Sequence, residues 1–161
     1  MPQRIRLDRD HIAFLESGVS IVVASCGDGG GPSLGFAHGC RVLPRGDRVR
    51  LFIAEPHCPT LIADIRRSGR IAAVFSRPDS NKTMQLKGVA AEIRALAAAD
   101  SRSLSGHIED FIANLAIVGT PPDLVRAVFS IEKGALVAVE FAPNAAFSQT
   151  PGPMAGDRLS I

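Results

Sequence analysis

The side chains best suited to chemistry lie between residues 32 and 88, in two short runs and one helix start. The runs are 32–39 (Pro-Ser-Leu-Gly-Phe-Ala-His-Gly) and 82–88 (Lys-Thr-Met-Gln-Leu-Lys-Gly). Between them, 57–60 (His-Cys-Pro-Thr) carries an imidazole, a thiol and a hydroxyl where a helix is expected to begin. We hypothesise that these segments form a polar seam on a β-barrel wall that receives a flat, phosphate-bearing ligand.

The elements that position these segments belong to a chain with the size of one domain. Its 161 residues and 46% hydrophobic content are enough for one core. A net charge of +2 is too small to indicate a nucleic-acid surface. No apolar run reaches the ~18 residues that a membrane span needs. We therefore expect a protein that binds neither nucleic acid nor membrane.

The cysteines and the N-terminus favour the cytoplasm. Cys26, Cys40 and Cys58 are odd in number and lack paired spacing, which argues against a disulfide framework. Because no Cys-x-x-Cys motif is present, we expect no metal site. The N-terminal segment alternates Arg and Asp and lacks the apolar region of a secretory signal.

Runs of β-branched and apolar residues predict six strands, and cap residues predict four helical regions. The first three strands are joined too tightly for parallel crossovers, so an antiparallel barrel with helices at its side is expected. The strands are expected at 19–25, 33–43, 48–55, 70–76, 82–94 and 135–141. The helical regions are expected at 8–17, 57–67, 95–118 and 120–128. Pro59 lies in the first turn of the second region, and Ser105 or Gly106 is expected to cap a new helix within the third.

Two of these strands carry informative faces. Strict alternation over 33–43 leaves one face nearly bare, which allows a ligand, another element or a barrel corner at that point. The strand over 82–94 moves its apolar residues from even to odd positions at Gly88, which predicts a β-bulge. The first face holds Leu34, Phe36, His38, Cys40 and Val42, and the bare face holds Ser33, Gly35, Ala37, Gly39 and Arg41. Thr83, Gln85 and Lys87 form a polar row that is either a solvated face or a ligand edge.

The order of these parts resembles the pyridoxamine 5′-phosphate oxidase-like, FMN-binding split-barrel family. The resemblance covers roughly residues 14–141 and rests on order and spacing more than on any one motif. Its carriers are 15–18 (Leu-Glu-Ser-Gly), 31–33 (Gly-Pro-Ser), 59–65 (Pro-Thr-Leu-Ile-Ala-Asp-Ile), 70–75 (Arg-Ile-Ala-Ala-Val-Phe) and 84–88 (Met-Gln-Leu-Lys-Gly).

The resemblance implies a mainly β (α+β) fold, a six-stranded antiparallel split β-barrel with flanking helices, over residues 1–147. Residues 148–161 would form a Pro/Gly-rich tail, either docked or disordered. It also implies a homodimer with FMN at the subunit interface, and an oxidoreductase that passes hydride from a small-molecule substrate or electron donor through the flavin. The implied cofactor-binding residues are Gly35, Phe36, Ala37, His38, Glu55, His57, Thr60, Lys82, Thr83 and Gln85.

The chain departs from the family's best-known enzymes where they grip phosphate. Their arginine, lysine and basic segment correspond approximately to Gly35, Cys40 and Pro59-Thr60 here. Losing charge-assisted contacts worth ~1.5–3 kcal/mol each weakens phosphate binding by orders of magnitude. This favours a generic flavin reductase or flavin-binding role over pyridoxine metabolism. The remaining candidates for the phosphate are Thr60, backbone N–H groups, Arg41, Lys82 and Lys87.

Two further functions stay open. A haem-binding or haem-degrading barrel would use His38 or His57 as axial ligand, although a single histidine on a strand is more often structural. A non-enzymatic dimer that has lost its ligand is the other alternative. Cys58 is either a lowered-pKa thiol or a plain neighbour of the helix start.

Overall fold

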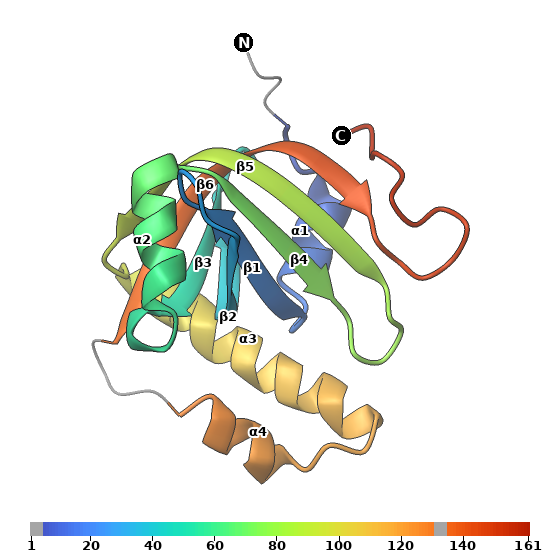
Figure 1. Ribbon diagram of the computed structural model, residues 1–161. Helices are drawn as coiled ribbons and strands as arrows, with labels where there is room; N and C mark the ends of the chain where they lie inside the picture. The colour runs from blue at the N-terminus through green and yellow to red at the C-terminus, as the bar shows by residue number, and fades with distance from the viewer. Residues whose placement is uncertain (1–4, 131–134) are drawn as a thin grey trace.

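Six antiparallel strands close into a barrel in a computed structural model that describes residues 5–130 and 135–161 (Figure 1). Around the barrel the strand order is β1-β2-β3-β6-β5-β4. The expected fold class, mainly β (α+β) with an antiparallel barrel and flanking helices, is confirmed. The strands are β1 (Ser20–Cys26), β2 (Pro32–Val42), β3 (Val49–Ala54), β4 (Ile71–Ser76), β5 (Thr83–Arg94) and β6 (Leu136–Ser148).

The helices lie outside the barrel (Figure 1). One of them, α2, lies beside β1, β2 and β5, whereas α3 packs along β2 and carries α4 on its far side (Figure 1). Within the described parts of the chain, no helix has the length and hydropathy of a membrane-spanning segment. The helices are α1 (Arg9–Leu15), α2 (Pro59–Ser68), α3 (Ala98–Ile117) and α4 (Pro122–Val128), with a short 3₁₀ helix, η1 (Glu55–His57), before α2.

The barrel interior is filled by the inward side chains of each strand. On β3, Val49, Leu51 and Ile53 are completely buried, as their alternation predicts. On β5, the pairing with β6 shifts between Lys87 and Gly88, which confirms the predicted bulge.

A bulge in β2 departs from the strict alternation predicted for this strand. The pairing with β3 shifts between Ala37 and Gly39. Leu34 and Phe36 are therefore 64% and 69% exposed, whereas Cys40 and Val42 are buried in the core. The expectation that all of these share one face with His38 is wrong, because strict alternation cannot pass through a bulge.

The helical segment after β5 also differs from the expectation. Ser105 and Gly106 do not start a helix, because α3 runs without a break from Ala98. The Asp100 carboxylate accepts a hydrogen bond from the Ala97 N–H at 2.8 Å and stabilises that earlier start. The Ser105 hydroxyl donates to the Ser101 carbonyl at 3.2 Å, inside the helix.

The C-terminal tail is docked. β6 is longer than expected because its pairing with β5 continues to Ser148. The chain then turns back, and the Leu159 N–H donates to the Ala146 carbonyl at 2.9 Å. Leu159 and Ile161 pack against the main core.

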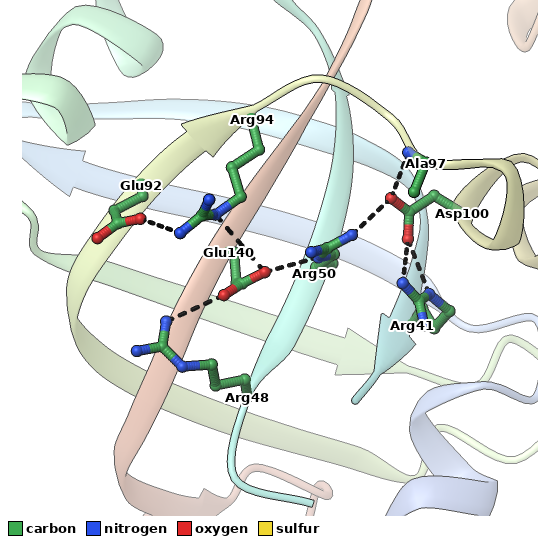
Figure 2. Close-up of polar contacts among 8 residues, drawn as sticks. All are labelled: Arg41, Arg48, Arg50, Glu92, Arg94, Ala97, Asp100 and Glu140. Atoms are coloured by element: carbon green, nitrogen blue, oxygen red, sulfur yellow. Dashed lines mark hydrogen bonds and ion pairs between the residues drawn. The ribbon is translucent and has the colours of Figure 1, made fainter. Parts of the chain in front are cut away.

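An ion-pair network on the outside of the barrel anchors the start of α3 (Figure 2). Arg50 lies between Asp100, at 2.9 Å, and Glu140, at 2.7 Å. Arg41 holds the other oxygen of Asp100 at 2.7 Å. Burial raises the pKa of Asp100, but the Ala97 N–H and the two guanidinium groups outweigh it and lower that pKa below 3.8. The stabilisation is therefore present above about pH 4 and lost as the pH falls through the lowered pKa.

We expect Asp100→Ala to lower the free energy of unfolding by about 3–5 kcal/mol, because it leaves the partly buried Arg41 without its carboxylate and removes one of the two carboxylates that hold Arg50. Denaturant unfolding followed by circular dichroism measures this. Glu109→Ala is the matched control, since it removes an exposed ion pair with Arg126 and should have a much smaller effect. Equal effects of the two substitutions would contradict an anchoring role for Asp100.

Candidate functional site

A cavity of about 720 Å³ lies between the barrel wall and the helices α3 and α4. Its volume is in the range of small-molecule sites, roughly 300–1,000 Å³. One wall is formed by β1, β2 and the start of α2, and the other by α3, α4 and the residues next to them. The barrel wall includes Ser20, Val22, Leu34, Gly35, Phe36, Ala37, His38, His57 and Cys58, and the helix wall includes Phe111, Leu115, Thr120, Leu124, Val125, Val128 and Phe129.

The bulge in β2 explains how this cavity is framed. A Cβ on Gly35 would lie 2.8 Å from Leu61 and 3.0 Å from Cys58, so the bare side of this glycine receives the start of α2. A Cβ on Gly39 would lie 3.2 Å from His107 of α3. The sequence left open why one face of this strand is nearly bare. At both glycines the reason is the close approach of another element. The cavity lies on the outward side of the strand.

The cavity lining is mostly apolar. Among the described residues that line it, none is Lys or Arg. The side chains able to form hydrogen bonds are the hydroxyls of Ser20 and Thr120, the imidazoles of His38 and His57, and the Cys58 thiol. Such a lining suits an apolar, flat ligand with few polar groups.

His38 is the most unusual of these side chains. It is only 7% exposed, and its Nδ1 has no hydrogen-bond partner among the described residues. Its ring meets that of Phe129 at 5.0 Å between centroids, in a T-shaped arrangement. Burial, with a smaller contribution from the nearby His57, lowers the pKa of His38 to about 4. The ring is therefore neutral at pH 7 and offers one N–H and one acceptor nitrogen.

The structure brings together half of the predicted site residues. Gly35, Phe36, Ala37, His38 and His57 all line the cavity. Two more lie next to it in the chain: Glu55 begins η1, and Thr60 is exposed in the first turn of α2. Glu55 is paired with Arg66 of α2 at 2.8 Å.

The predicted residues near β5 lie elsewhere. Lys82 places its Nζ 4.9 Å from the centre of the Phe14 ring, and Thr83 shares a 2.7 Å hydrogen bond with Ser76. Gln85 lies on the outward face of the barrel, in a row with Val74, Val22 and Phe36 across β5, β4, β1 and β2. At about 4.8 Å per strand, it is roughly 14 Å from Phe36.

The other predicted phosphate contacts are engaged away from the cavity. Arg41 binds Asp100, and the Nζ of Lys87 lies 5.2 Å from the centre of the Phe147 ring. Burial, with a smaller contribution from Glu55, raises the pKa of the Cys58 thiol, which favours a structural neighbour over an activated thiol. In the described parts of the chain, no group of three or more side chains is arranged to hold a metal ion.

The helix wall was missed by the sequence reasoning. Apolar residues at helical spacing, such as Leu124 and Val128, are ordinarily assigned to a core. Here both remain exposed and line the cavity. One sequence signal could have indicated this wall: the helix between Pro122 and Val128 is too short to bury its apolar residues on two faces.

The neutral state of His38 predicts a pH dependence of stability. Its pKa is lower in the folded than in the unfolded chain, so only the unfolded chain gains a proton between about pH 6.5 and 4, and stability falls as the pH falls. Between pH 7 and 5 the free energy of unfolding of the native protein should fall by about 2 kcal/mol more than that of His38→Phe. Urea unfolding at each pH measures this difference. Parallel losses in both proteins would contradict a neutral, buried His38.

Comparisons with known proteins agree with this architecture. No protein-family model matches the sequence, and no curated protein matches it significantly. Among solved structures, an F420 reductase is similar at TM-score 0.56 and 14% identity, over 87% of this chain and 98% of the other. A putative pyridoxamine 5′-phosphate oxidase from Lactobacillus delbrueckii gives 0.54 and 12%, over 89% and 94%. HupZ of Group A Streptococcus gives 0.55 and 15%, over 93% and 100%.

At these identities the likeness concerns the fold. It agrees with the closed six-stranded barrel and with the order of elements that the sequence predicted. The chain has the split-barrel fold of pyridoxamine 5′-phosphate oxidase-like proteins.

Proposed function

We propose that the chain binds FMN in the cavity beside His38, as a homodimer, and acts as an FMN-dependent oxidoreductase. The observation that carries this proposal is the mostly apolar cavity wall formed by β1 and β2, next to the buried imidazole of His38. A flavin ring has two apolar faces and hydrogen-bonding groups along its edges, which suits such a wall. Solved structures of the same fold named as an F420 reductase and a putative pyridoxamine 5′-phosphate oxidase give further support.

The residues present fit the ring of FMN better than its phosphate. The backbone of 35–38 and the side chains of Val22 and His38 would hold the ring. The phosphate would lie at the start of α2, where first-turn N–H groups have no partner within the helix. Thr60 adds an exposed hydroxyl there.

The chain's own residues then bind and orient the cofactor. When bound, FMN accepts and donates hydride, so the protein needs no acid or base for that step. The apolar lining would exclude water from the ring, and the strand backbone at 35–38 would contact its edge.

The outward face of the barrel supports a homodimer. Cross-strand neighbours Val74, Val22 and Phe36 form an apolar row on it. The neighbouring row contains Ala72, Ala24 and the exposed Leu34. Exposed apolar surface of this kind marks interaction sites, and it continues into the cavity through Val22, Leu34 and Phe36.

A haem-binding role is the second candidate. It is favoured by the position of both His38 and His57 on the cavity, where a neutral imidazole can serve as axial ligand. A dimer without ligand remains the third.

Titration with FMN, riboflavin and haemin, followed by absorption and flavin fluorescence, separates these functions. We expect FMN to bind about tenfold more tightly than riboflavin, because the helix start adds only one or two contacts for phosphate. Thr60→Glu should weaken the binding of FMN about tenfold and leave the binding of riboflavin unchanged, so riboflavin serves as the internal control.

A saturable shift and sharpening of the haemin Soret band, with no response to either flavin, would replace the first candidate by the second. Spectra that stay identical to those of the free ligands in all three titrations would leave the dimer without ligand.

The homodimer is tested by sedimentation velocity. The native chain should sediment as a dimer, and Phe36→Glu should produce monomers by placing a charge in the apolar row. Met154→Glu is the control, because Met154 is 62% exposed but lies in the tail. A monomeric native chain, or an unaltered Phe36→Glu dimer, would contradict this interface.

A further inference from the structure

The exposed apolar side chains of the described residues are unevenly distributed. Leu34 and Phe36 of β2, and Leu124 and Val128 of α4, belong to the small group of large apolar residues that remain mostly exposed. All of these side chains line the same cavity. Burying such a residue contributes about 1.5–3 kcal/mol, so this concentration indicates that the cavity binds an apolar molecule.

The helix wall is built separately from the barrel. Phe111 and Ile112 of α3 and Val125 of α4 form their own small core, with Phe129 packed against it. The opposite edge of α4 presents Leu124 and Val128 to the cavity. This wall is therefore a supported apolar surface that faces β2 across the cavity.

His38 supplies a single buried polar contact between the two walls. Its ring packs against that of Phe129 in a T-shaped arrangement, and its Nδ1 is unpartnered among the described residues. Because Nδ1 has almost no accessible surface, a ligand in the cavity would place its hydrogen-bonding group against the other ring nitrogen, Nε2. No described lining residue carries the positive charge that a strongly anionic group would need.

We propose that the helix wall binds the substrate, and that this substrate is an uncharged, planar, mostly hydrophobic molecule with one hydroxyl-like group that hydrogen-bonds to His38. This inference rests on the proposed function in one respect only, namely that the bound molecule is called the substrate. The flavin would occupy the β1–β2 wall, and the substrate would lie between it and α4.

A second copy of the chain explains these features less well. A dimer formed across the outward sheet face would cover Leu34 and Phe36. It would not fill a cavity of about 720 Å³. A small molecule can.

Three related probes test the proposed class in the full-length protein by calorimetry: 2-naphthol, naphthalene and naphthalene-2-sulfonate. We expect 2-naphthol to bind about tenfold more tightly than each of the others, since one satisfied hydrogen bond and one avoided buried charge each contribute at least that factor. Equal or tighter binding of the sulfonate would overturn the proposal.

Two helix variants locate the site. Val128→Asp should weaken the binding of 2-naphthol about tenfold or more, because it places a charge in the cavity. Ile117→Asp is the matched control, because Ile117 is equally exposed on the neighbouring helix but does not line the cavity. Equal effects of the two substitutions would overturn the assignment.

His38→Phe should remove the preference for 2-naphthol over naphthalene while retaining naphthalene binding. An unchanged preference would overturn the role given to His38. If that variant does not fold, the helix variants still decide the proposal. Flavin binding is measured separately. A chain that binds 2-naphthol but not FMN would support the ligand class and contradict the proposed function. A chain that binds FMN but not 2-naphthol would support the proposed function and overturn the ligand class.

Discussion

The one-residue shift in β2 between Ala37 and Gly39 determines how the rest of the molecule is arranged. Before the shift, Gly35 turns its bare side toward the start of α2. After it, Gly39 turns its bare side toward α3. His38 lies at the shift itself, buried against Phe129 and facing the cavity between the barrel wall and the helices α3 and α4. A strand without this bulge would place its two glycines on one side and could not receive both helices.

The cavity also depends on an electrostatic anchor at some distance from it. Asp100, fully buried, joins the first turn of α3 to Arg41 of β2 and Arg50 of β3. Because α3 carries α4, this anchor holds the apolar helix wall opposite the barrel wall. The guanidinium groups of Arg41 and Arg50 are thereby committed to carboxylates, and no described residue that lines the cavity is Lys or Arg. This division explains why a flavin ring suits the site better than a phosphate does.

Much of the fold could be predicted from the sequence because its signals are local. The alternation in β3 and the change of phase at Gly88 each appear in a few consecutive residues, and the order of elements supported the barrel. The bulge in β2 gave no such signal, since Gly35, Ala37 and Gly39 are small enough to suit either face. The continuous α3 was missed because Ser105 and Gly106 favour helix ends in isolation, whereas the buried contacts of Asp100 favour an earlier start. The helix wall depends on tertiary packing, which periodicity cannot distinguish from an ordinary core.

The central claim, that FMN binds beside His38, is tested most directly by the ring-nitrogen NMR resonances of the four histidines during FMN titration. His38 and His57 line the cavity, whereas His107 is hydrogen-bonded to the Val19 carbonyl and His11 to Asp8. We predict saturable shifts of the His38 and His57 nitrogens, with those of His107 and His11 unchanged. Saturable FMN binding that leaves His38 unmoved, or no binding at all, would contradict the account.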